Sequence, residues 1–191
     1  MTSGSLLRLA NLEDAPAIAA IYRPSVEHSI ISFELEAPDE AEVRKRIAAT
    51  LPTFPWLVAA IGQQVVGYAY ASRHRDRAAY EHSVDCSVYV DQRAHRGGLA
   101  RTLYTALFAL LEAQHFHMAF AGISLPNEPS ERFHAAMGFV PLGVYREVGF
   151  KFGQWRDVQW SQRPLDAGSQ ARPIVPFSAL DPAVIARALL G

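Results

Sequence analysis

Residues 84–111 read VDCSVYVDQRAHRGGLARTLYTALFALL. This stretch predicts an apolar strand, a short basic turn with two glycines, and an amphipathic helix whose leucines share one face. The first N–H groups of a helix have no partner inside it and lie at the positive end of its dipole. A strand that runs through a glycine turn into a helix therefore favours a bound phosphate or pyrophosphate. Arg93, Arg96 and Arg101 add positive charge beside the turn.

The composition is that of one ordinary globular domain. The chain has 191 residues, half of them apolar and 19% charged, with a net charge of −1. Because that charge favours neither nucleic acid nor an anionic membrane, we predict no partner of either kind. No apolar run approaches the ~20 residues that span a bilayer, and the N-terminus lacks the pattern of a signal peptide. The single cysteine, Cys86, excludes an intrachain disulfide and fits a reducing, cytoplasmic location.

Strands and helices alternate along the rest of the chain. Asn11 and Asp39 are candidate N-caps of the first two helices, and the pair Arg23-Pro24 is expected to end the first. Expected strands cover residues 6–10, 56–61, 65–72, 84–90, 117–125, 139–145 and 151–162. Expected helices cover residues 11–22, 40–50 and 128–136, with one after the glycine turn and a short one from Asp181-Pro182. This order predicts one α/β or α+β domain with a mixed sheet.

Several motifs resemble one acetyltransferase family. The turn HRGGLA resembles the acyl-CoA pyrophosphate loop of the GNAT superfamily, Gln/Arg-x-x-Gly-x-Gly/Ala, and LPNEPS, FHAAMGF and KFGQWRDV resemble its phosphinothricin N-acetyltransferase branch. The resemblance implies a GNAT-like single domain, α/β (α+β), with a central mixed, mostly antiparallel sheet whose splayed central strands are flanked by helices. It makes residues 1–164 the acetyltransferase domain and residues 165–191 an extension packed on the same domain or at a dimer interface. His95 and Asp85 depart from the pattern, which usually has Gln or Arg and Glu there.

The resemblance implies that acetyl-CoA is the co-substrate and assigns its site. Backbone N–H groups of residues 96–100 hold the pyrophosphate, and the backbone of residues 88–90 contacts the pantetheine arm and polarises the thioester carbonyl. From spacing alone, the turn could equally be a plain strand-to-helix connection, and Asn127 only a helix N-cap. The implied acetyl-CoA-binding residues are Val88, Tyr89, Val90, His95, Arg96, Gly97, Gly98, Leu99, Ala100, Arg101, Asn127 and Ser130.

Asp85 and His134 are the candidate catalytic residues. Asp85 interrupts an apolar strand, and a buried carboxylate needs a reason to be there. It is either half of an ion pair with an arginine or a general base that takes a proton from the substrate ammonium, directly or through water. The resemblance places His134 near the departing sulfur, for proton transfer; the alternative is a packed or surface histidine. The seven histidines show no metal-ligand spacing, so we predict no metal.

The resemblance also assigns an acceptor site. It implies that Arg75, Arg77 and Tyr80 bind an acid group of the substrate, because arginine forks bind oxyanions through two hydrogen bonds. It implies Phe33 as a wall and Glu27 as the partner of the ammonium. From composition alone, the run RHRDRAAY at residues 73–80 is typical of a solvated loop.

The combined prediction is an N-acetyltransferase that moves the acetyl group of acetyl-CoA to the α-amino group of a small acidic amino acid analogue. The analogue is phosphinothricin-like or methionine sulfoximine/sulfone-like, and its amine attacks the thioester directly, which would detoxify an inhibitor. Two alternatives stay open: acetylation of a different amine (a polyamine, a drug or a protein N-terminus) and a non-catalytic acyl-CoA-binding module. The resemblance further implies a homodimer formed through the C-terminal strands and tail.

Overall fold

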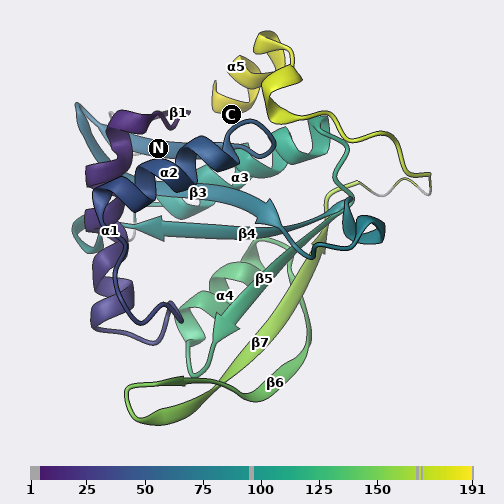
Figure 1. Ribbon diagram of the computed structural model, residues 1–191. Helices are drawn as coiled ribbons and strands as arrows, with labels where there is room; N and C mark the ends of the chain where they lie inside the picture. The colour runs from purple at the N-terminus through teal and green to yellow at the C-terminus, as the bar shows by residue number, and fades with distance from the viewer. Residues whose placement is uncertain (1–4, 95–96, 167, 169, 191) are drawn as a thin grey trace.

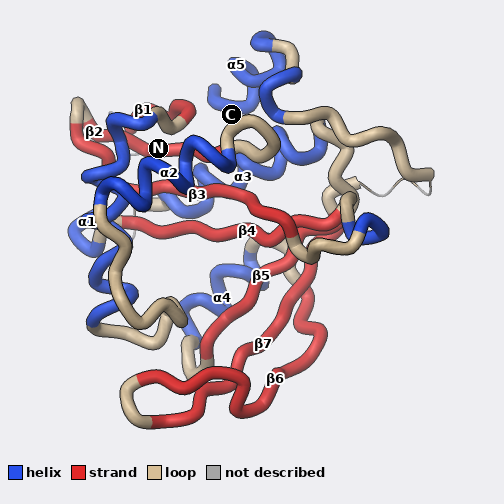
Figure 2. The backbone as a smooth tube through the Cα atoms, viewed as in Figure 1, coloured by secondary structure: helices blue, strands red, loops and turns tan. Residues whose placement is uncertain are grey.

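A computed structural model describes residues 5–94, 97–166, 168 and 170–190. In this part of the chain, helices cover both faces of an open seven-stranded sheet with the order β1-β2-β3-β4-β5-β7-β6 (Figures 1 and 2). The strands are β1 Ser5–Leu9, β2 Trp56–Ile61, β3 Gln64–Arg73, β4 Ser83–Val90, β5 Met118–Ser124, β6 Val140–Lys151 and β7 Gln154–Pro164. The helices are α1 Ala15–Glu27, α2 Glu40–Thr50, α3 Leu99–Ala113, α4 Glu128–Ala136 and α5 Pro182–Leu190.

The centre of the sheet is a short parallel contact between β4 and β5. Residues 83–85 of β4 lie opposite residues 118–120 of β5, and the ladder between the two strands ends there. Beyond Asp85 the strands separate, as Figure 1 shows, while β4 stays paired with β3 as far as Val90. The other neighbouring strands in the described sheet are antiparallel. The predicted mixed, mostly antiparallel sheet with splayed central strands is confirmed.

Alternation along β2 shows how both faces of the sheet become buried. Leu57 and Ala59 belong to the core beneath α3, whereas Trp56 and Val58 belong to the core beneath α1 and α2. Successive side chains of a strand point to opposite faces, so a strand covered on both sides needs a continuous apolar run such as WLVAAI. The predicted apolar face of α3 is confirmed, since Leu99, Leu103, Leu107, Leu110 and Leu111 are all buried.

The expectation that Arg23-Pro24 ends the first helix is wrong, because α1 continues through Pro24 to Glu27. Proline has no N–H to donate to the carbonyl of Ala20, which weakens the helix at that point. Two features offset this loss. The His28 N–H donates to the Pro24 carbonyl at 3.0 Å, and Val26 is completely buried, so the last turn of α1 is held by the core.

The last strand pair is longer than predicted. Residues 146–150 were expected to separate two strands, yet β6 runs through them with an irregularity in its pairing with β7 between Tyr145 and Gly149. Glu147 has a positive φ of 50°, and its N–H donates to Asp157 Oδ1 at 2.8 Å. A side-chain acceptor from β7 thus replaces the ladder where the bulge interrupts it.

The C-terminal extension packs on the same core as α3. Phe177 is buried in that core, and α5 packs beside α3. The buried Gln114 amide at the end of α3 donates at 2.8 Å both to the Thr53 carbonyl and to the Val175 carbonyl. These contacts join the extension to two distant segments of the domain. Among the described residues, no helix combines the length and the apolar character needed to cross a membrane.

Candidate active site

The junction between β4 and α3 depends on one glycine. Gly98 is the N-cap of α3 and has a φ of 76°, which glycine adopts without the steric cost that a Cβ would bring. A Cβ at Gly98 would meet no atom within 4 Å, so the backbone angle and not the space requires glycine here. His95 and Arg96, the two predicted loop residues before the glycines, lie outside the described residues.

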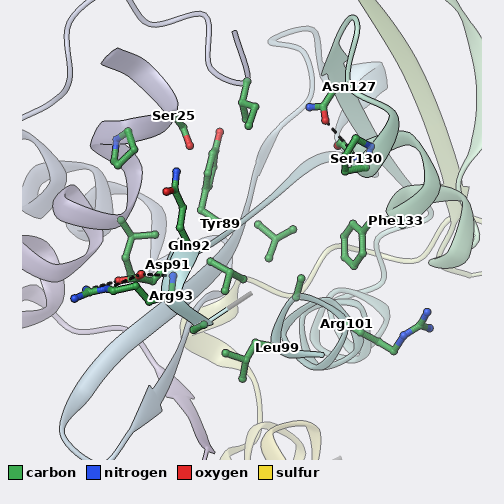
Figure 3. Close-up of a pocket in the computed structure, with 18 of the residues that line it drawn as sticks. Ser25, Tyr89, Asp91, Gln92, Arg93, Leu99, Arg101, Asn127, Ser130 and Phe133 are labelled. Carbon is green, nitrogen blue, oxygen red and sulfur yellow. Dashed lines mark hydrogen bonds and ion pairs between the residues drawn. The ribbon is translucent and has the colours of Figure 1, made fainter. Parts of the chain in front are cut away.

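A cavity of about 990 Å³ opens where β4 leaves β5. Its walls are the end of β4, the first turns of α3 and α4, and one side of α1 (Figure 3). The first turn of α3 thus brings N–H groups, which have no partner inside the helix, to the cavity wall. The predicted acetyl-CoA-binding residues on this wall are Val88, Tyr89, Val90, Gly98, Leu99, Ala100, Arg101, Asn127 and Ser130.

The charge at the mouth of this cavity is smaller than the sequence suggests. Arg93 was expected to add positive charge to the turn, but its guanidinium bonds to both oxygens of Asp91, at 3.0 and 2.7 Å. That carboxylate offsets its charge. Arg101 also lines the cavity, and the structure assigns no carboxylate partner to it among the described residues. The charge of Arg93 is therefore offset by a carboxylate, whereas that of Arg101 is not offset by any described carboxylate.

The start of α4 forms the opposite wall. The Asn127 side chain accepts a hydrogen bond from the Ser130 N–H at 3.3 Å, so the N-cap role is confirmed, and both residues also face the cavity. One turn further on, His134 is buried and also lines the cavity. Its Nδ1 lies 2.8 Å from the Ser130 carbonyl oxygen. Because a carbonyl only accepts, Nδ1 carries the proton and Nε2 is the nitrogen that bears the lone pair.

A tyrosine links His134 to β4. The Tyr104 hydroxyl donates to the Cys86 carbonyl at 3.1 Å and lies 3.4 Å from His134 Nε2. Cys86 is the first residue of β4 beyond its ladder with β5, so Tyr104 satisfies a carbonyl that the splay would leave without a partner. Burial lowers the pKa of His134, so the imidazole is neutral at pH 7 and its unprotonated nitrogen is available as a proton acceptor.

Asp85 lies where β4 and β5 part, and its partner is a histidine. His74 Nδ1 lies 2.6 Å from Asp85 Oδ1, and the two side chains are 8% and 29% exposed. Burial raises the pKa of Asp85, and the hydrogen bond from His74 and the nearby charge of Arg75 lower it by less. The expected arginine ion pair is therefore not the main contact. A carboxylate with a raised pKa is suited to accept a proton near neutral pH.

The predicted acceptor residues are only partly brought together. Tyr80 lies edge-on to the His74 ring at 6.1 Å, and the Arg75 guanidinium lies 5.6 Å from the ring of Trp160, which also contacts His74. Arg77 is exposed at the start of the short helix Ala78–Tyr80.

The other two predicted acceptor residues lie elsewhere. Phe33 packs on Gly149 of β6, where an added Cβ would overlap the phenyl ring. Glu27 ends α1, pairs with Arg23 at 3.2 Å, and does not line the described cavity. The structure therefore does not bring Glu27 to Asp85 or to the cavity wall.

Comparison with known proteins identifies the family. The model of the Acetyltransferase (GNAT) domain matches residues 7–160. The chain belongs to the GNAT acetyltransferase family.

It is 41% identical over 169 residues to a phosphinothricin N-acetyltransferase of Alcaligenes faecalis, covering 87% of this chain and 86% of that protein. It is 37% identical over 174 residues to the phosphinothricin N-acetyltransferase of Streptomyces viridochromogenes, covering 91% and 95%. A GNAT phosphinothricin acetyltransferase of Sinorhizobium meliloti, solved in complex with AcCoA, superposes with a TM-score of 0.84 at 33% identity, covering 92% and 97%.

Three features of this GNAT site were not predicted from the sequence. The wall formed by α1, including Pro24 and Ser25, was missed because the helix was expected to end before it. Tyr104 was missed because it stands among the leucines of α3, where helical periodicity marks it as core. His74 was missed because its partner depends on strand register. Ser72 of β3 lies opposite Asp85, and His74 follows two residues later. Aligning the segment VDCSVYV antiparallel to the preceding strand, with Ser72 opposite Asp85, would have placed His74 near Asp85.

Proposed function

We propose that this GNAT enzyme transfers the acetyl group of acetyl-CoA to the α-amino group of a small acidic amino acid analogue. Phosphinothricin and methionine sulfoximine or sulfone are the first acceptors to test. The observation that carries the proposal is the splay of β4 from β5, which has a helix N-terminus at one end and a buried carboxylate at the other. The names of the most similar relatives support the choice of acceptor. The thiol product and the single buried cysteine fit a cytoplasmic location.

The cavity suits the donor. Backbone N–H groups at Leu99 and Ala100, with the charge of Arg101, would hold the pyrophosphate at the start of α3. Residues 88–90 of β4 would contact the pantetheine arm on one side, with Asn127 and Ser130 on the other. A volume of about 990 Å³ lies at the upper end of what ligand pockets offer, as a long flexible donor requires.

The acceptor nitrogen loses two protons during the reaction. The acceptor arrives as an ammonium, and Asp85 takes one proton, which breaks an N–H bond and forms an O–H bond on the carboxylate. The neutral amine then attacks the thioester carbon, and the carbon–sulfur bond breaks as the amide forms. We propose that neutral His134, which lines the cavity, takes the second proton of the nitrogen through Nε2, the ring nitrogen beside the Tyr104 hydroxyl, and passes it to the departing thiolate. The Asp85 side chain, which is 29% exposed, then releases its proton to solvent and returns to the ionised form.

Attack is direct, without an acyl-enzyme. Cys86 is the one cysteine of the chain, and its side chain is buried. Burial raises the pKa of its thiol far above neutrality, so it supplies no thiolate nucleophile at pH 7. Asp85, the proposed base, does not face Cys86, because neighbouring residues of β4 project to opposite faces of the sheet.

Gly149→Ala tests the role of Phe33 as a wall of the acceptor site. The new methyl group would overlap the Phe33 ring. Because Gly149 is held in the paired strand β6, we expect the ring to move and not the strand. We expect the KM of the acceptor to rise several-fold while the KM of acetyl-CoA stays unchanged, measured by steady-state kinetics. Gly143→Ala is the matched control on the same strand, because a Cβ there meets no atom within 4 Å. Equal effects of the two variants would remove Phe33 from the acceptor site.

We also propose a homodimer formed through β6 and β7. β6 is one of the two edge strands of the described sheet, and an edge strand with exposed apolar side chains favours pairing with another chain. Phe150 and Trp155 are opposite each other on the two strands, 5.3 Å apart between ring centroids, and are 55% and 61% exposed. The other exposed apolar side chains on this hairpin are Val140, Leu142, Tyr145, Val148 and Phe152.

The double substitution Phe150→Glu and Trp155→Glu is expected to convert the dimer to a monomer, because it buries two carboxylates in an apolar contact. Sedimentation equilibrium measures the mass. Leu190→Glu is the control, since this side chain is 87% exposed on α5, away from the hairpin. A monomeric wild type, or a double variant that remains a dimer, would contradict this interface.

A thiol-release assay with acetyl-CoA tests the function. The acceptors are phosphinothricin, methionine sulfoximine, methionine sulfone, the common amino acids, a polyamine and a peptide with a free N-terminus. We expect release with the acidic analogues only. Release with another amine class would replace the acceptor assignment, and acetyl-CoA binding without release for any amine would favour a non-catalytic module.

A further inference from the structure

The side chain of His74 is buried, unlike that of a residue in a solvated loop. It follows the last residue of β3, yet its side chain is only 8% exposed. Its ring stacks on Phe120 of β5 at 4.1 Å between centroids and 12° between planes. The rings of Trp160 and Tyr80 meet it edge-on at 5.7 and 6.1 Å. Aromatic contacts from three other elements thus fix the plane of the imidazole.

The fixed ring plane determines the geometry of its hydrogen bond. His74 Nδ1 lies 2.6 Å from Asp85 Oδ1, which is the distance of a charge-assisted bond. An ionised carboxylate only accepts hydrogen bonds, so with Asp85 ionised His74 Nδ1 is the donor. One carboxylate oxygen is therefore held by the ring. The Asp85 side chain remains 29% exposed, so the group is accessible as well as anchored.

We propose that His74 is a positioning residue for the acetyl transfer, which orients the Asp85 carboxylate and keeps it ionised so that the oxygen not bonded to the ring accepts the proton of the substrate ammonium. The inference rests on the proposed function, in which Asp85 is the base. The proton moves from the nitrogen to Asp85, an N–H bond breaks and an O–H bond forms, and the imidazole keeps its own proton throughout.

The surroundings of the pair explain why the carboxylate needs this support. Burial disfavours the ionised form of Asp85, while the His74 hydrogen bond and the charge of Arg75 favour it. Neighbouring Tyr70 and Cys86 are neutral at pH 7, because burial raises the pKa of both groups. The other contacts of the His74 ring are aromatic. Among the described residues, the titratable and charged groups that face the pair are Arg75, Tyr70 and Tyr80, while Cys86 lies next to Asp85 in the chain and projects to the other face of β4.

His74→Phe separates positioning from packing. Phenylalanine keeps a flat ring against Phe120 but cannot donate to Asp85, so the pKa of Asp85 rises further. We expect the acid limb of the kcat/KM profile for the acceptor to move up by about one pH unit, with a roughly tenfold lower kcat/KM below both limbs. His74→Asn places an amide N–H near the position of Nδ1, and we expect it to return the limb toward that of the wild type.

His117→Asn is the matched control, because His117 is an exposed histidine at the start of β5 and takes no part in the site. Its profile should overlay that of the wild type. Each variant is also assayed for acetyl-CoA binding and thermal unfolding, since a purely structural role would lower kcat at every pH without moving the limb. A limb that stays in place in a folded, active His74→Phe variant overturns the inference and leaves the acetyltransferase proposal intact. Loss of the proposal itself would instead appear as no thiol release by the wild type.

Discussion

Asp85→Asn is expected to lower kcat for the acceptor by about 10²–10⁴-fold, the usual contribution of a positioned general base. Asparagine has the shape of the carboxylate and still accepts the His74 hydrogen bond, but it cannot take up the proton of the ammonium. The affinity for acetyl-CoA should be unchanged, because Asp85 is not part of the cavity wall. A stopped-flow or steady-state thiol-release assay measures kcat, and calorimetric titration measures acetyl-CoA binding.

Asp76→Asn is the control for this substitution, because Asp76 is an exposed carboxylate in the neighbouring loop. It should leave kcat and donor affinity as they are. The prediction fails if Asp85→Asn turns over at the wild-type rate across the pH range, since no base would then be missing. Equal losses in the two variants would point to a general charge effect in place of proton transfer.

The same substitution should make the protein more stable at pH 7. Burial raises the pKa of Asp85 above its ordinary value of 3.8, so folding favours the protonated carboxyl. That contribution is present below the unfolded pKa and is lost as the pH rises through the folded pKa. At pH 7 the buried carboxylate is a cost that asparagine removes. The midpoint of urea unfolding should therefore rise at pH 7, and the gain should shrink as the pH falls toward 4.

Leu103→Ala has the largest expected effect on stability, a loss of about 2–5 kcal/mol in the free energy of unfolding. Leu103 is fully buried in α3 and lies beneath the β3–β4 pair. A Cβ on Gly67 of β3 would lie 3.4 Å from its Cδ1 and 3.3 Å from Val90, which shows how closely the helix approaches these strands. Truncation leaves a cavity under the strand that forms the wall of the donor site, so the KM of acetyl-CoA should rise as well.

Urea unfolding at constant m-value measures this loss. Leu6→Ala is the control, because Leu6 is 61% exposed on β1 and its truncation should change stability by less than about 0.5 kcal/mol. If Leu103→Ala cost as little as Leu6→Ala, the packing of α3 on the sheet would not be what holds the β4–α3 junction in place.

The order of strands and helices was predictable because it depends on local signals. Apolar periodicity marks α3, a continuous apolar run marks β2, and side-chain caps mark the starts of α2 and α4 at Asp39 and Asn127. The splay between β4 and β5 was different. It came from the family resemblance, because no local pattern in a strand states where its neighbour stops pairing with it.

The parts that could not be predicted depend on tertiary contacts. Helix α1 continues past Pro24 because the burial of Val26 outweighs the one hydrogen bond lost at the proline. The partner of Asp85 was decided by strand register and by aromatic rings from β5 and β7, so the sequence could offer an arginine but not select His74. The role of Tyr104 is similar, since the carbonyl that it satisfies has no partner only because the sheet splits.

The short ladder at residues 83–85 is the point from which the two halves of the sheet separate. Its central pair, Val84 opposite Ala119, is completely buried, so a change in the size of either side chain must be absorbed by the residues around it. The walls of the cavity diverge from that point, because β4 and β5 are no longer paired beyond it. Val84 and Ala119 do not line the cavity, yet they lie where its two walls begin to separate. We therefore expect a change in the size of either side chain to alter the distance between the first turns of α3 and α4.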